Sequence, residues 1–198
     1  MKYILHLTIA SICFITSCDN NNQATNPTKI ETKKIDPLLD KIFKKDFPNF
    51  KDNQIVRDNA LSALNKAIDS VLPLSYLNDI PLKVFKVSKN PHGKGALVQF
   101  YTDDYSKNDT TSLANSVRFD IIGLMDETLA ASINEKNTYF LYSHKYKRLN
   151  KTEAFLIVNQ VYFSPTPKID KGIGYGEEFE FHLGNFICEV DSLNTTTK

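Results

Sequence analysis

The sequence predicts a single α+β domain, in which N-terminal helices pack on a mostly antiparallel, five- to six-stranded sheet. Apolar residues recur with helical spacing between about residues 53 and 72, and they alternate with polar residues, as in strands, from residue 82 onward. No repeat and no second linker interrupts residues 36–193, which are long enough to bury one hydrophobic core. Helices followed by strands are typical of an α+β domain.

Two helices are predicted before the strands. Asp36 is placed as an N-cap with Pro37 at the first helical position, and Pro48 bounds this short helix. A longer helix is predicted from about Asn53 to Leu72. Its apolar residues fall on one half of the helical wheel and its polar residues on the other, so we expect one face to pack on a sheet.

The predicted strands are residues 82–87, 96–102, 117–124, 138–147, 154–163 and 178–190. The turn cluster at residues 90–95 predicts a hairpin between the first two strands, and Asn150-Lys151 indicates a second hairpin between the fourth and fifth. Residues 154–163 are apolar on both strand faces, which predicts a central strand. In the last strand the apolar phase reverses at Gly184, which predicts a β-bulge or a sharp bend there.

A short helix is predicted at residues 126–132, between the third and fourth strands, because acidic residues begin a segment of helix-forming composition. The order of three strands, a short helix and further strands resembles that of an OB-fold barrel. This resemblance concerns topology alone and makes the sixth strand and the leading helices additions. An open antiparallel sheet with helices on one face is the alternative.

The N-terminus has the composition of an export signal. Lys2 precedes an apolar run from Ile4 to Ile15, which is shorter than the roughly 20 apolar residues that a membrane-spanning helix needs. The sequence Phe14-Ile15-Thr16-Ser17-Cys18 resembles the lipobox of bacterial lipoproteins. The resemblance implies a signal peptide at residues 1–17 and a diacylglycerol on Cys18, although Ile15 and Thr16 depart from the commonest pattern. An ordinary signal peptide with an incidental cysteine is the alternative.

The cysteines and the charges agree with this N-terminal processing. Cys13 leaves with the signal and Cys18 takes the lipid, so Cys188 remains alone and no intramolecular disulfide is expected. Residues 18–35 are predicted to be a polar, flexible tether with a reach of roughly 20–25 Å, and residues 194–198 a disordered tail. The balance of 24 Lys+Arg against 23 Asp+Glu gives no reason to expect nucleic acid as a partner.

A predicted binding surface lies in the fourth strand and the turn after it. Aromatic and basic side chains alternate there, and such side chains can stack on rings and neutralise anionic groups. We therefore expect an envelope protein, an oligosaccharide or a polyanion to bind Tyr142, His144, Lys145, Tyr146, Lys147 and Arg148. The alternative is a solvated hairpin tip whose lysines protect a sheet edge.

No metal site or cofactor is predicted, because neither His92, His144 nor His182 has another histidine or cysteine at ligand spacing. The sequence favours a non-enzymatic interaction or ligand-binding module of the bacterial cell envelope, lipid-anchored on the periplasmic or surface side. An envelope hydrolase or transferase without a recognisable motif is the alternative, and Asp120, His144 and His182 are its first candidate residues. A protective protein that neutralises a toxin or protease is a third possibility.

Overall fold

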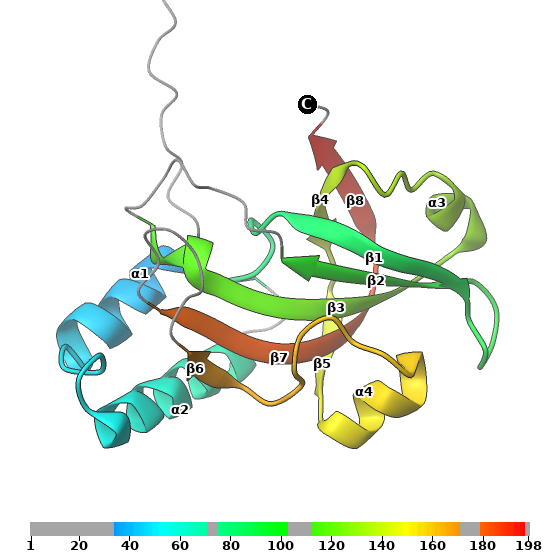
Figure 1. Ribbon diagram of the computed structural model, residues 1–198. Helices are drawn as coiled ribbons and strands as arrows, with labels where there is room; N and C mark the ends of the chain where they lie inside the picture. Colours follow the sequence, from blue (N-terminus) through cyan, green and yellow to red (C-terminus); the bar gives the residue numbers. More distant parts are fainter. Residues whose placement is uncertain (1–33, 71–74, 103–111, 171–178, 197–198) are drawn as a thin grey trace, which may run out of the picture. The chain divides into compact units, whose positions relative to one another are not determined.

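The computed structural model describes residues 34–70, 75–102, 112–170 and 179–196 (Figure 1). These residues belong to one structural unit, Thr32–Lys198. The predicted signal peptide, Cys18 and nearly all of the predicted tether lie outside the described residues. Within the described part, every helix is too short or too polar to cross a membrane.

The N-terminal helices match the prediction in position but not in every contact. α1 (Asp36–Leu39) continues into a π-helix (Asp40–Asp46), and α2 spans Gln54–Ser70. The buried residues of α2 are Ala60, Leu64 and Ile68, so a single face packs inward as expected. Asp36 is not an N-cap, because it is the first residue of α1 and its carboxylate points elsewhere. The buried carboxylate accepts hydrogen bonds from Ser112 Oγ and from the Ala114 backbone N–H. These two donors lie at the start of the 3-10 helix Leu113–Ser116.

The strands form one mixed sheet. Its order is β5-β7-β3-β2-β1-β4-β8, with β6 beside β7, and β3–β7 is the parallel pair in this sheet. The strands are β1 (Leu82–Lys89), β2 (Ala96–Thr102), β3 (Val117–Met125), β4 (Thr138–Tyr142), β5 (Lys145–Leu149), β6 (Lys168–Asp170), β7 (Glu180–Glu189) and β8 (Ser192–Thr196). The short helix α3 (Glu127–Ala131) lies between β3 and β4, as predicted.

The sheet curls because two of its strands are bent. Only Ser143 and His144 separate β4 from β5, and only Val190 and Asp191 separate β7 from β8. β5 pairs with β7 and β4 pairs with β8, so the two bent strands form one long antiparallel ladder. In this ladder β4 also pairs with β1, through Leu82 and Tyr139. This pair completes a circuit of strands β1-β2-β3-β7-β5/β4-β1. The predicted fold class is confirmed, and Figure 1 shows its barrel-like form.

One predicted strand is wrong. Residues 151–158 form helix α4 (Lys151–Val158), so the expected hairpin at Asn150-Lys151 is wrong as well. A capping box starts this helix: the Asn150 side chain accepts from the Glu153 backbone N–H at 3.0 Å, and the Glu153 carboxylate accepts from the Asn150 backbone N–H at 3.0 Å. Two further strands, β6 and β8, were not predicted, and β8 extends to Thr196 within the predicted tail.

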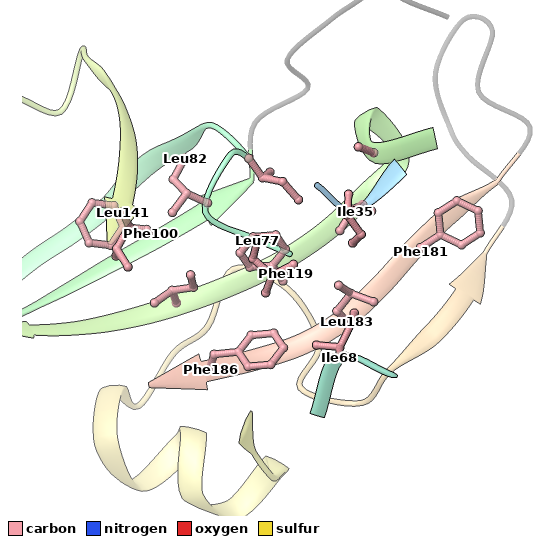
Figure 2. Close-up of a cluster of buried hydrophobic side chains, with 14 of the residues drawn as sticks. Ile35, Ile68, Leu77, Leu82, Phe100, Phe119, Leu141, Phe181, Leu183 and Phe186 are labelled. Carbon is pink, nitrogen blue, oxygen red and sulfur yellow. The ribbon is translucent and has the colours of Figure 1, made fainter. Parts of the chain in front are cut away.

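Each face of the sheet has a hydrophobic cluster. The larger cluster packs α1, the π-helix and α2 on one face, and its fully buried side chains include Phe119, Phe181 and Phe186 (Figure 2). The smaller one packs α4 on the other face and consists of Leu97, Ile122, Leu149 and Ala154. β3 is therefore buried on both sides.

The bend predicted at Gly184 is confirmed as a β-bulge. Arg118 pairs with His182 but Asp120 pairs with Asn185, so one residue of β3 faces two residues of β7. Gly184 adopts a φ of +90°. The extra residue restores the buried phase, because Phe181, Leu183, Phe186 and Cys188 all lie in the larger cluster.

Gly184→Ala is expected to lower the free energy of unfolding by about 2 kcal/mol or more. A side chain at positive φ costs about 1–2 kcal/mol, and the new Cβ would lie 2.7 Å from the Pro165 carbonyl oxygen. Gly93→Ala is the matched control, since its Cβ would meet Asn90 Nδ2 at 3.6 Å without positive φ. Urea unfolding of both variants measures the difference; equal stabilities would contradict the strain at Gly184.

Candidate functional site

The predicted binding residues lie in β4, β5 and the bend between them, but the structure separates them into two groups. Tyr142 is half-buried at the end of β4. His144, Lys145 and Lys147 are exposed and face acidic side chains: His144 Nδ1 lies 2.7 Å from Asp191 Oδ1, Lys145 pairs with Glu189 at 3.3 Å, and Lys147 pairs with Glu153 of α4. The hydrogen bond from Lys147 is the main cause that lowers the pKa of Glu153.

Tyr146 and Arg148 point the other way, toward α2. The Tyr146 hydroxyl donates to the Ile68 carbonyl oxygen at 2.8 Å, and Arg148 donates to Asn65 Oδ1 at 3.0 Å. The Arg148 guanidinium also lies over the Phe186 ring, 5.3 Å from its centroid, and burial lowers its pKa although Asp69 opposes that shift. These two side chains fasten α2 to the sheet. The alternation along β5 therefore leaves Lys145 and Lys147 exposed, whereas Tyr146 and Arg148 are half-buried and directed toward α2.

Two of the three candidate catalytic residues lie on the same face of the sheet. Asp120 and His182 lie on the same face of the sheet, under the segment that follows α4, whereas His144 lies with Asp191 at the β4–β5 bend. Neither Asp120 nor His182 has much contact with solvent, with 0% and 8% of their surfaces exposed. The structure thus brings two of the three residues together, but in a buried position.

Asp120 is hydrogen-bonded to Asn185 in a buried polar cluster, and Gln99 is buried on the adjacent strand β2. Its Oδ2 atom accepts from Asn185 Nδ2 at 2.8 Å and from the Phe163 backbone N–H at 2.9 Å. Asp120 Oδ1, Asn185 Oδ1 and both amide atoms of Gln99 are buried without a hydrogen-bond partner among the described residues. Burial raises the pKa of Asp120 to about 7, although the hydrogen bonds from Phe163, Tyr162 and Asn185 oppose this.

His182 lies beside this cluster and interacts with charged neighbours. Its Nε2 atom is 3.2 Å from Glu180 Oε2, and its ring meets Phe163 edge-on with centroids 5.7 Å apart. Burial lowers the pKa of His182, and Glu180 opposes this shift. Glu180 also pairs with the buried Arg118 at 3.4 Å. The imidazole is therefore held between a carboxylate and an aromatic ring.

An apolar groove lies on the outer side of α4. Phe155 and Leu156 are 62% and 72% exposed, whereas Ala154 on the opposite side of the helix is fully buried. The groove has a volume of about 320 Å³ and is lined by Lys151, Thr152, Phe155, Leu156, Gln160, Val161 and Pro165. We call it the α4 groove. A helix that is apolar on both sides, with one side left open, is typical of an interaction surface.

The sequence interpretation missed this groove because residues 154–163 were assigned to a central strand, which would bury Phe155 and Leu156. The spacing of Asn150 and Glu153 before an apolar run was the signal that could have identified the helix.

Cys188 is unsuited to nucleophilic chemistry here. It is buried in the larger cluster, and burial raises the pKa of its thiol to about 12. In the described ranges, no group of three or more histidine, cysteine, aspartate or glutamate side chains is placed to hold a metal ion.

Comparison with known proteins identifies no relative: no family model matches the chain, and neither a curated protein nor a solved structure does.

Proposed function

We propose that this protein is a lipid-anchored component of the bacterial cell envelope and that its domain is a non-enzymatic interaction module. The lipid on Cys18 would hold it on the periplasmic or surface side of a membrane, and the α4 groove would bind a partner protein. The groove carries the proposal, because it exposes two large neighbouring apolar side chains on a chain whose charge is otherwise balanced.

The lining of the groove indicates the chemistry of its partner. Phe155, Leu156, Val161 and Pro165 offer an apolar surface, and Lys151 contributes a cation at the start of α4 with no ion pair among the described residues. A protein segment with apolar side chains next to a carboxylate would complement both features. Lys147 lies nearby, because it pairs with Glu153 of α4, so the outward residues of the predicted β5 surface would border the bound partner.

A Phe155→Ser, Leu156→Ser double variant is expected to weaken partner capture roughly 100-fold. Burying the two side chains in a complex is worth about 3 kcal/mol, and every 1.4 kcal/mol corresponds to about tenfold in affinity. Stability should change little, because both side chains are exposed in the free protein. In-cell cross-linking of the lipidated protein, followed by affinity capture and mass spectrometry, measures the effect.

The matched control is Ile55→Ser, which removes an apolar side chain on α2 that is 72% exposed. This variant should capture the partner as well as the unchanged protein does. Capture that is lost equally in both variants would argue against the α4 groove. Recovery of the protein alone would contradict the interaction module and favour the envelope hydrolase or transferase, for which Asp120 and His182 are the residues to test.

A further inference from the structure

Residues 159–167 connect the α4 groove to the buried polar cluster. This segment has no helix or strand, and it begins at Asn159, which ends α4 with a φ of +61°. Gln160, Val161 and Pro165 form one wall of the groove. The residues between them attach the segment to the sheet: Tyr162 stacks on Tyr101 with centroids 4.0 Å apart, and the Phe163 backbone N–H donates to Asp120. A movement of this segment would therefore change the groove.

Hydrogen bonding to Asp120 is a polar attachment of this segment to β3. Asp120 has no exposed surface, and its Oδ2 atom already accepts two hydrogen bonds. Its Oδ1 atom is buried without a hydrogen-bond partner among the described residues, as is Asn185 Oδ1. A proton on Oδ1 removes a buried negative charge, which is costly without a cationic partner.

The charged groups around Asp120 are engaged with one another. On β3, Arg118 pairs with Glu180 and donates to the Asn115 carbonyl oxygen. On β7, His182 lies against Glu180, and on β6, Lys168 pairs with Asp170, which also faces His182. The covering segment contributes only the Tyr162 phenol as a titratable group among its described side chains. Among the described residues, no cation is therefore placed to stabilise an ionised Asp120.

We propose that Asp120 is a positioning residue for the α4 groove: with its proton it keeps residues 159–167 seated on the sheet, and loss of that proton favours their release. The inference rests on the proposed function, because it describes how the proposed binding groove is regulated. At acidic pH the groove wall is fixed, and toward neutral pH it becomes free to rearrange around a partner.

The direction follows from proton linkage. In the seated state burial raises the pKa of Asp120 to about 7, whereas in the released state water reaches the carboxyl and its pKa returns toward the ordinary value of 3.8. The seated state therefore binds the proton more tightly, and the ratio of released to seated protein rises by up to about tenfold per pH unit between about pH 4 and pH 7. His182 acts in the opposite direction, because burial lowers its pKa in the seated state.

Hydrogen exchange of the backbone amides in residues 160–167, measured on the purified full chain and corrected for the intrinsic chemical rate, tests the proposal. Protection is expected to fall roughly 50-fold between pH 5 and pH 7. In Asp120→Asn, which keeps an acceptor for the Phe163 N–H but does not titrate, protection should not fall. Asp46→Asn, at an exposed site, is the control and should keep the unchanged profile.

A flat profile in the unchanged protein would overturn the proposal, and this result needs no variant to fold. A fall in protection that persists in Asp120→Asn would assign the effect to another group and would also overturn it. The measurement needs no partner, so it is independent of the interaction module. If the protection of residues 160–167 depends on pH but no partner is captured, the result counts against the proposed function alone.

Discussion

Cys18→Ser is expected to abolish the incorporation of radiolabelled fatty acid into this protein in cells. The sequence before Cys18 resembles a lipobox, and the cysteine thiol is the only group of that motif that can carry the diacylglycerol. Acyl chains contribute about 0.8 kcal/mol for each methylene buried in a bilayer, so several chains together hold a protein firmly.

Two matched variants control for the general loss of a thiol. Cys13→Ser changes a residue that leaves with the predicted signal, and Cys188→Ser changes one that is buried in the core. Both should incorporate the label, and both should partition into the detergent phase, as we expect of the unchanged protein. Label that remains in Cys18→Ser would contradict lipidation at this position and would favour an ordinary signal peptide.

The elements that the sequence predicted well are those with an unambiguous local pattern. α2 was predicted from about Asn53 to Leu72 and spans Gln54–Ser70, because its apolar positions fall on one helical face. β2 matches its predicted range, Ala96–Thr102. The bulge at Gly184 could be predicted because a reversal of the apolar phase within one strand requires an extra residue to restore a common buried face.

α4 was assigned wrongly because its composition permits two structures. Residues 154–158 are apolar on every face, so their spacing does not distinguish a buried strand from a helix. The capping box of Asn150 and Glu153 favours the helix. It satisfies backbone N–H groups at the helix start, which have no partner within the helix. The apolar residues that remain outside, Phe155 and Leu156, then form the α4 groove.

The remaining site features depend on contacts between distant residues. Asp120 and Asn185 are 65 positions apart and meet only because β3 and β7 pair in parallel. The contacts of Tyr146 and Arg148 depend on a distant element in the same way: α2, far earlier in the chain, accepts a hydrogen bond from each of these half-buried side chains. Local sequence patterns carry no information on either contact.

Phe186→Ala is expected to lower the free energy of unfolding by about 3–5 kcal/mol. Phe186 has no exposed surface and contacts three side chains in the larger cluster: Phe119 at 6.0 Å and Tyr146 at 5.8 Å between ring centroids, and the Arg148 guanidinium at 5.3 Å. Truncation leaves a cavity and removes the ring under a buried cation. Small domains are stable by about 5–15 kcal/mol, so a large share of the stability would be lost.

Phe155→Ala is the matched control, because it removes the same ring from an exposed position on α4. Its free energy of unfolding should change by less than about 0.5 kcal/mol, since exposed side chains contribute little to the folded state. Urea unfolding followed by circular dichroism measures both variants. A loss below about 1 kcal/mol in Phe186→Ala would contradict the packing of α2, β5 and β7 around this ring. Equal losses in the two variants would instead mean that α4 belongs to the core, which would leave the proposed partner no free apolar surface to bind.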